Sequence, residues 1–385
     1  MQKHTPRVAL ELTRAVAMAA ASSGWKAGPA ALPFVQWMQC REWLKTWPPH
    51  SFMKRPVAYF RDGCLGDEAK ASLNATYLQC GKPEAIESAS ADITRTVLRR
   101  LNHTRLVFLG DSLSFEHFVS TVCFLATPVP ELMTSPASLS VRVGDEPDAH
   151  YCVRLRLDPG SKATLCFLEW FGKVKHRARP DWISPSYEAS ISNRTKEALA
   201  MMASATWNQP LMRRVVEQWK LGRRDRVVAN IGLMFGENPG PLLVRGVTSF
   251  VDAYRMLPEQ TRFSLLWRET APQHFSTRGG LYAAGQMNAS ALQCTSRSAH
   301  DGYNALTNPI VARRGGPGVA MLSVWRATDQ RFRQRPLEHS PNDCTHYCLP
   351  GAALGHWTLA LVRNLLSRDS CAAGGLSASS SSSRR

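Results

Sequence analysis

A serine that could act as a nucleophile occupies the third position of Gly110-Asp111-Ser112. The apolar stretch before it, Arg105 to Leu109, is typical of a strand, and Phe118 and Val122 after it have the spacing of a buried helix face. In α/β proteins, reacting groups collect at the carboxyl ends of strands, where the next helix offers free N–H groups to an anion. Ser112 is therefore a candidate nucleophile for acyl transfer, and its alternative role is that of a helix N-cap.

A candidate base for this serine lies far along the chain, in Asp343-Cys-Thr-His346-Tyr-Cys348. A carboxylate three residues before a histidine can orient the imidazole, whose other nitrogen then takes the serine proton. Asp343 and His346 are thus candidates for the orienting carboxylate and the general base. The alternatives are bracing of a loop by hydrogen bonds, or a metal site built from Cys344, His346 and Cys348. We expect no metal, because Cys-x-His-x-Cys lacks the usual spacing of zinc ligands.

Four blocks of sequence together form a recognisable pattern. They are Gly110-Asp111-Ser112 with Cys123, the strand end Asn230-Ile-Gly232, Arg268-Glu-Thr-Ala-Pro-Gln-His274-Phe275 with Gly279-Gly280, and Asp343-Cys-Thr-His346-Tyr-Cys348-Leu-Pro-Gly351. This pattern resembles the plant trichome-birefringence-like polysaccharide O-acetyltransferases of the PC-esterase superfamily. The resemblance extends from about Thr104 to Leu366, is thinner over residues 40–101, and is absent at both ends.

The resemblance implies an SGNH-hydrolase-like fold (the GDSL type) with three α/β/α layers and a mainly parallel sheet. A cysteine-bearing N-terminal segment would wrap this α/β core, and a small insertion lobe would complete it. The implied triad of Ser112, Asp343 and His346 takes an acetyl group from a donor and passes it to a polysaccharide hydroxyl. We expect no bound cofactor and no metal, with the acetyl donor acting as a co-substrate.

Further site residues are implied by the same resemblance. An oxyanion hole needs donors aimed at the carbonyl oxygen as it gains charge, and the candidates are the N–H groups of Ser112 and Gly232 and the amide of Asn230. Asn230 could instead brace a turn. Arg268 and His274 would hold substrate or line the cleft, with a buried hydrogen-bonding role as their alternative. The full set of oxyanion and substrate residues is Gly110, Asp111, Asn230, Gly232, Arg268 and His274.

The chain departs from the family pattern at two places. Phe115-Glu116 stands where an Arg-Asn pair usually follows the nucleophile, and a His-Trp-Trp run is missing after the Asn230-Ile-Gly232 strand end. The first change alters oxyanion or substrate contacts, and the second bears on the acceptor. Two other functions therefore stay open. One is a carbohydrate O-acetylesterase with the same triad, and the other is an inactive glycan-binding wall protein.

The composition is strongly basic, with a formal net charge of +17 over 385 residues. Such a protein attracts anionic partners, which for a glycan-acting enzyme favours uronate-bearing or sulfated polymers. We therefore expect a polysaccharide or oligosaccharide acceptor, acidic ones included. No nucleic-acid-binding motif is present and the arginine pairs are scattered, so we expect no nucleic acid partner. A solvated basic surface is the alternative, and the oligomeric state is left open.

Ten cysteines permit five disulfides, but their connectivity does not follow from sequence. The resemblance implies a Cys294–Cys344 bridge and ties Cys123 and Cys348 to two of the three N-terminal cysteines, which are Cys40, Cys64 and Cys80. The alternative is a cytosolic protein with reduced, buried cysteines, and strand-like surroundings make Cys152 and Cys166 suit simple burial.

The compartment expected from the resemblance is the secretory pathway, in the Golgi lumen. Four N-glycosylation sequons are compatible with it, at Asn74, Asn102, Asn193 and Asn288. No membrane anchor is visible, because the apolar run from 8 to 21 is interrupted by Glu11 and Arg14 and is shorter than the roughly 20 residues of a membrane span. Either the family's N-terminal anchor is absent or the native start lies elsewhere.

Four segments are expected along the chain. Residues 1–35 are a leader or flexible arm, 36–90 a loop-rich, cysteine-bearing segment, 91–368 the PC-esterase or SGNH-like catalytic domain, and 369–385 a disordered serine-rich tail.

Helices and short apolar strands alternate within the catalytic segment, which is typical of a parallel sheet. The expected helices are 93–101, 196–203, 211–220, 247–257 and 354–366, and the expected strands are 226–233, 263–268 and 319–325. Residues 151–157 and 163–171 are predicted to form a hairpin beside the sheet. Asp343 and His346 are placed in the loop before the last helix.

Overall fold

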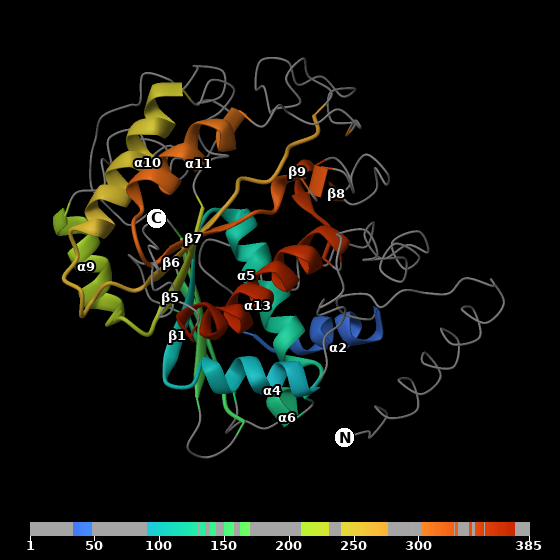
Figure 1. The fold of residues 1–385 in the computed structure, drawn as a ribbon. Helices are drawn as coiled ribbons and strands as arrows, with labels where there is room; N and C mark the ends of the chain where they lie inside the picture. The colour runs from blue at the N-terminus through green and yellow to red at the C-terminus, as the bar shows by residue number, and fades with distance from the viewer. Residues whose placement is uncertain are drawn as a thin grey trace, which may run out of the picture.

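The computed structural model describes residues 34–47, 91–129, 131–134, 139–143, 150–157, 162–169, 209–230, 240–275, 294, 302–326, 328–329, 339–340, 343–349 and 351–373. Within these residues the chain is a mixed α/β protein with a mostly parallel sheet (Figure 1).

The sheet has seven strands in the order β2-β3-β4-β1-β5-β6-β7. Five of them run parallel, and these are β1 (Thr104–Gly110), β4 (Ala163–Glu169), β5 (Arg226–Ala229), β6 (Ser264–Arg268) and β7 (Val319–Leu322). The strands β2 (Leu139–Val143) and β3 (His150–Leu155) add an antiparallel edge. Central parallel strands are buried on both faces, which explains why β1 reads almost continuously apolar.

Helices cover both faces of this sheet, an arrangement compatible with a three-layer α/β/α fold. One face carries α2 (Phe34–Leu44), α4 (Ala91–Arg100), α5 (Ser112–Ala126) and α13 (Ala352–Ala373), with the short α6 (Glu131–Thr134) beside them. The other face carries α9 (Gln209–Trp219), α10 (Gly240–Arg255) and α11 (Gly302–Arg314). None of the described helices is long and apolar enough to cross a membrane.

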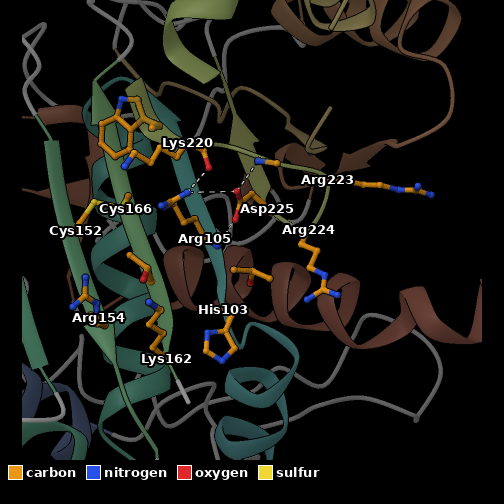
Figure 2. A pocket seen from close by; sticks show the side chains of 14 residues that line it. His103, Arg105, Cys152, Arg154, Lys162, Cys166, Lys220, Arg223, Arg224 and Asp225 are labelled. Atoms are coloured by element: carbon orange, nitrogen blue, oxygen red, sulfur yellow. Dashed lines mark hydrogen bonds and ion pairs between the residues drawn. A yellow bond between two sulfur atoms is a disulfide. The ribbon is translucent and has the colours of Figure 1, made fainter. Parts of the chain in front are cut away.

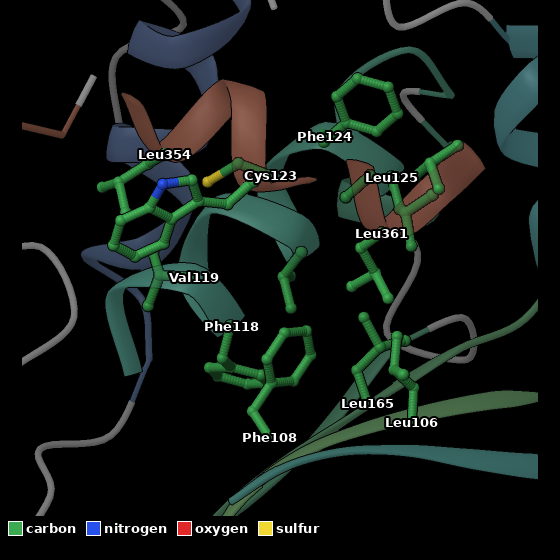
Figure 3. Close-up of a cluster of buried hydrophobic side chains, with 14 of the residues drawn as sticks. Leu106, Phe108, Phe118, Val119, Cys123, Phe124, Leu125, Leu165, Leu354 and Leu361 are labelled. Carbon is green, nitrogen blue, oxygen red and sulfur yellow. The ribbon is translucent and has the colours of Figure 1, made fainter. Parts of the chain in front are cut away.

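Alternate residues of β1 divide the core into two clusters. Leu106 and Phe108 point toward α5 and α13, whereas Val107 and Leu109 pack against the helices of the other face. Figure 3 shows the first cluster, where the rings of Phe108 and Phe118 lie 5.9 Å apart. Burying a phenylalanine contributes about 1.5–3 kcal/mol, so this cluster fixes α5, which begins at Ser112, firmly against the sheet.

Most expected elements of the catalytic segment are present. The helix predicted at 247–257 begins earlier, at Gly240 of α10, because Pro241 is tolerated in a first helical turn. The helix α13 continues to Ala373, so residues 369–373, expected to belong to the disordered tail, are helical. The helix expected at 196–203, the arm before residue 34 and the rest of the tail lie outside the described residues.

Two expectations about the elements were wrong. The 151–157 and 163–171 hairpin forms, as β3 and β4, but it does not lie beside the sheet, since β4 pairs along its whole length with β1. Asp343 and His346 lie on a short strand, β9 (Asp343–Tyr347), which pairs with β8 (His339–Ser340), and not in a loop. Helix α2 (Phe34–Leu44) joins the end of the expected arm to the start of the cysteine-bearing segment, whose residues 48–90 lie outside the described part of the chain.

Three disulfides are present among the described cysteines. Cys40–Cys123 joins α2 to α5, and Cys294–Cys344 joins residue 294 to β9. Both agree with the bridges implied by the resemblance, and Cys348 is also disulfide-bonded. Cys152 and Cys166, whose surroundings suited the alternative of reduced, buried cysteines, form a disulfide across the β3–β4 pair. Cys64 and Cys80 lie outside the described residues.

Candidate active site

Ser112 is the first residue of α5, directly after the carboxyl end of β1. In the parallel part of the sheet, β1 lies between β4 and β5. The helix after β1, α5, covers one face, and the helix after β5, α10, covers the other. The space outside the ends of β1 and β5 is therefore a topological switch point, where ligands bind in open α/β sheets.

The N-cap of α5 is Asp111 and not Ser112. Asp111 has an extended backbone, and its Oδ1 accepts the N–H groups of Leu113 at 3.0 Å and Ser114 at 3.3 Å. This leaves the Ser112 hydroxyl free of capping. The Asp111 side chain does not accept the N–H of Ser112, which also lies in the first turn of the helix. This N–H can therefore have the expected oxyanion role.

Gly110 allows the close approach of β5 behind the nucleophile. A Cβ at this position would lie 2.6 Å from the carbonyl oxygen of Asn230, a distance that real Cβ atoms essentially never show. The Asn230 N–H donates to the Leu109 carbonyl at 3.0 Å across the same gap. Gly110 therefore shapes the turn that presents Ser112, and no side chain can replace it without displacing β5 or α5.

His346 lies beside Ser112, although the two residues are 234 positions apart. Its Nε2 is 2.6 Å from the Ser112 Oγ, a short hydrogen bond between a hydroxyl and an imidazole. Both side chains are only partly buried, so the pair is open to a substrate. This is the arrangement of a serine nucleophile with a general base.

The strand that carries His346 is fixed by the segment after β6. The Tyr347 hydroxyl donates to the Pro272 carbonyl at 2.7 Å, and the Gln273 Nε2 donates to the Thr345 Oγ1 at 2.8 Å. The His274 N–H also donates to the carbonyl of Cys344, at 3.1 Å. Side chains on both sides of His346 are thus anchored, which limits movement of the imidazole.

Glu116 connects the nucleophile helix to the same strand. It follows Ser112 by four residues, so both lie on one face of α5. Its Oε2 accepts the N–H of Tyr347 at 3.3 Å, one residue beyond His346. In the sequence, Glu116 stands out only as a departure from the family pattern. Its helical spacing from Ser112 was the signal that could have identified it.

Arg268, the last residue of β6, is completely buried beneath this site. Its Nη2 donates to the Ser114 Oγ at 3.1 Å, and its guanidinium lies 4.6 Å from the centre of the Trp357 ring. In this structure Arg268 therefore has the buried, hydrogen-bonded position that was the alternative to holding substrate. His274 is equally buried, with Nε2 3.7 Å from the Asp329 Oδ1.

The charges around Arg268 influence one another. Burial lowers the pKa of Arg268 to about 10, against the opposing effect of the Asp111 and Glu116 carboxylates. Burial raises the pKa of Asp111, and Arg268 counteracts this. Burial also lowers the pKa of His117 well below its ordinary value, with Arg268 acting in the same direction, so His117 is neutral. The buried cation thus balances the carboxylates on either side of the nucleophile.

Asn230 has the bracing role that was the alternative to an oxyanion donor. Its Nδ2 donates to the Arg268 carbonyl at 2.8 Å and to the Thr270 Oγ1 at 3.1 Å, which uses both amide hydrogens and joins β5 to β6.

Gly232 lies outside the described residues. The backbone of Asp343 begins β9, but its side chain is not described. Of the three expected oxyanion donors, Asn230 is engaged elsewhere and Gly232 is not described. The Ser112 N–H is the one whose described position suits the role.

Across the described residues, no group of three or more His, Cys, Asp or Glu side chains could hold a metal ion. Compared with models of known protein families and with curated proteins, the chain matches none of them.

Proposed function

We propose that this protein is a serine-dependent O-acetyltransferase that moves an acetyl group onto hydroxyls of a polysaccharide. The observation that carries the proposal is the 2.6 Å contact between the His346 Nε2 and the Ser112 Oγ. The position of Ser112 supports the proposal further, because this residue begins a helix at the topological switch point of the sheet. The similarity of four sequence blocks to trichome-birefringence-like acetyltransferases supplies the acceptor class and an SGNH-like fold.

In the first half of the proposed reaction, the Ser112 Oγ bonds to the carbonyl carbon of an acetyl donor while its proton passes to the His346 Nε2. The bond from that carbon to the donor's leaving group breaks, and the leaving group takes the proton from His346. The acetyl group is then an ester on Ser112. Asp343 is proposed to hold the imidazole in the required tautomer.

In the second half, a sugar hydroxyl gives its proton to His346 and its oxygen bonds to the acetyl carbon. The Ser112 Oγ leaves and recovers the proton, which regenerates the free enzyme. Each half passes through an oxyanion that the N–H of Ser112 is placed to stabilise, aided by the positive end of α5. The acetyl donor is a co-substrate, and no bound cofactor is required.

The proposed compartment is the secretory pathway, in the Golgi lumen. The three disulfides among the described cysteines support an oxidising compartment, because such bridges are rare in cytosolic proteins.

The proposal is tested by incubating the protein with 4-nitrophenyl acetate, with and without oligosaccharides, and analysing the products by mass spectrometry. Acetylated sugar is expected from the wild type, whereas Ser112→Ala and His346→Ala should lose activity by about a thousandfold or more. Acetate alone would identify the protein as an acetylesterase. No turnover and no labelling of Ser112 by a fluorophosphonate probe would identify it as an inactive glycan-binding protein.

A further inference from the structure

A second concave site lies where β1, β4 and β5 begin, at the opposite end of these strands from Ser112 (Figure 2). It has a volume of about 560 Å³, within the range of ligand-binding pockets. Arg105, which lines it, lies at the other end of β1 from Ser112, roughly 20 Å away along an extended chain. The pocket is therefore separate from the candidate active site.

The lining of this pocket is strongly cationic, with Arg105, Arg154, Lys162, Lys220, Arg223 and Arg224 around it. Among the described lining residues, Asp225 is the one carboxylate, and it is already engaged. Its Oδ1 accepts the N–H of Arg105 at 2.6 Å, and its Oδ2 accepts the N–H of Gly222 at 2.8 Å. The positive charge of the pocket thus exceeds what Asp225 can balance.

Several of these cations have no acidic partner within the described part of the chain. The Nε of Arg154 is buried without a hydrogen bond, and the exposed ammonium of Lys162 and guanidinium of Arg224 make no ion pair there. A buried donor without an acceptor costs about 1–3 kcal/mol. A bound anion would supply that acceptor and remove this cost, so binding of an anion in the pocket is favoured.

Backbone strain is found at the same place. His103 and Lys220, with φ of 57° and 48°, are the two non-glycine residues of positive φ among those the structure describes, and both line the pocket. Lys220 occupies the position after α9 where glycine is favoured, since its N–H donates to the Glu217 carbonyl and the next N–H donates to the Val216 carbonyl. The positive φ of Lys220 is thus explained by the end of α9, and His103 is the lining residue whose strained backbone has no such explanation.

We propose that this pocket binds an anionic polysaccharide with carboxylate or sulfate groups on successive sugars. Figure 2 shows Arg154 and Lys162 on the side of β3 and β4, and Arg223 and Arg224 on the other side of Arg105. Charges on two sides suit a ligand with more than one anionic group. The sugar rings between those anionic groups are rich in hydroxyls, so a polysaccharide can bind without an apolar surface on the protein.

Two other polyanionic partners fit less well. Single-stranded nucleic acid stacks its bases on accessible aromatic rings, but Trp219, the one Trp, Tyr or Phe among the described lining residues, is 9% exposed. An anionic membrane surface is usually bound with the help of exposed apolar side chains. Among the described residues, Met256 is the one large hydrophobic residue that is exposed, and it does not line the pocket.

The inference rests on the proposed function, because the bound polymer is taken to be the acetyl acceptor. A chain held at the pocket presents its other sugars to Ser112 at a raised local concentration. The site should therefore lower the KM for long acidic acceptors while leaving turnover of a small neutral ester unchanged.

The test measures binding by calorimetry, with full-length Ser112→Ala protein so that no acetyl transfer occurs. Any N-linked glycan is removed first, because Asn102 heads a sequon next to His103. The carboxylate probe is polygalacturonate with its fully methyl-esterified form as control, and the sulfate probe is dextran sulfate with dextran as control. At least one charged polymer should bind, and both neutral polymers should bind at least about tenfold more weakly.

Charge-matched variants locate the binding. Lys162→Glu with Arg224→Glu should weaken binding of the charged polymer about tenfold or more. Arg245→Glu with Arg313→Glu changes the net charge equally, at exposed positions on α10 and α11 outside the pocket, and should weaken it less than about twofold. Equal losses of affinity for the charged polymer in the two double variants would overturn the proposal. It would also be overturned if a single-stranded DNA oligomer bound more tightly than the polymer and lost this binding only in the pocket variant.

Arg154→Gln supplies a second measurement. Because it removes the Nε of Arg154, a buried donor without an acceptor, the unfolding temperature should hold or rise while affinity for the charged polymer falls several-fold. A lower unfolding temperature with unchanged affinity would mean that Arg154 is structural and would count against the site.

Failure of this inference can be separated from failure of the proposed function. Every pocket variant is also made with Ser112 intact and treated with a fluorophosphonate probe. Labelling without polymer binding would refute the pocket alone. Polymer binding without labelling would refute the acetyl-enzyme and leave a polysaccharide-binding protein.

Discussion

At the scale of single residues, Glu116 is the side chain that joins the two halves of the candidate active site. It lies on α5 with Ser112 and accepts the N–H of Tyr347, next to His346 on β9. It also faces the buried guanidinium of Arg268. Since Glu116 is buried and does not reach a substrate, its proposed role is to position the imidazole against the hydroxyl.

Substitution of Glu116 tests this positioning role. Glu116→Gln keeps an oxygen for the Tyr347 N–H but removes the charge, so kcat with 4-nitrophenyl acetate should fall about tenfold. Glu116→Leu removes both the oxygen and the charge, so kcat should fall about 100-fold. The KM should change little in either variant. Circular dichroism and thermal unfolding serve as controls for folding. Wild-type kcat in a folded Glu116→Leu protein would show that the contact positions nothing.

The Asp111 carboxylate should make stability depend on pH. Burial raises its pKa, so the folded state holds this proton more tightly than the unfolded state does. The ionised carboxylate therefore costs stability at neutral pH, and the cost shrinks as the pH falls below the raised pKa and is lost below the ordinary pKa of an aspartate. Because asparagine caps helices as well as aspartate does, Asp111→Asn should unfold at a higher temperature than the wild type at pH 7.

This difference should shrink toward about pH 4, near the ordinary pKa of an aspartate, where both side chains are neutral. Thermal unfolding of both proteins between these pH values measures it. A less stable Asp111→Asn at pH 7, with a gap that closes in acid, would show instead that pairing with Arg268 outweighs the cost of burial.

At the scale of elements, β9 is the strand on which the candidate site most depends, because it carries His346 and is tied to residue 294 by the Cys294–Cys344 bridge. Replacing both cysteines by serine should lower the free energy of unfolding by up to about 4 kcal/mol for a loop of this length. It should also lower kcat, since β9 becomes freer to move.

The Cys152–Cys166 bridge is a matched control. It closes a shorter loop, 14 residues against 50, and its two cysteines line the cationic pocket and do not touch β9. Its removal should cost up to about 3 kcal/mol and leave kcat unchanged. Equal losses of kcat in the two double variants at a temperature where both are folded would contradict the special role of β9.

Local patterns predicted the elements better than their arrangement. The strands β1, β5, β6 and β7 were visible as short apolar runs, since central parallel strands are buried on both faces. The β3–β4 pairing was predictable because it is local. The pairing of β4 with β1 was not, because two apolar runs contain no information about which neighbour each takes.

The candidate site was predictable only in part, for the same reason. The types and order of Ser112 and His346 suggested a pair, and the structure brings them into contact. The charges around Arg268 were not foreseen, because whether Asp111, Glu116 and Arg268 are buried together depends on how α5 meets β6. A charged residue in sequence is more often exposed.

At the scale of the whole molecule, the net charge of +17 should make acceptor use sensitive to salt. The Debye length falls from about 30 Å at 0.01 M to about 8 Å at 0.15 M ionic strength. The kcat/KM for acetylation of polygalacturonate should therefore fall steeply over this range, whereas that for 4-nitrophenyl acetate alone should stay constant. A parallel decline of both would show that salt acts on the active site and not on attraction of the polymer.

The central claim is that Ser112 carries the acetyl group, and trapping that intermediate tests it most directly. Wild-type protein is mixed with 4-nitrophenyl acetate, quenched in acid within the first turnover, digested and analysed by peptide mass spectrometry. One added acetyl group is expected on Ser112 of the wild type, and none is expected in His346→Ala. An unmodified Ser112 peptide during active turnover, or an acetyl group on Ser114 instead, would contradict it.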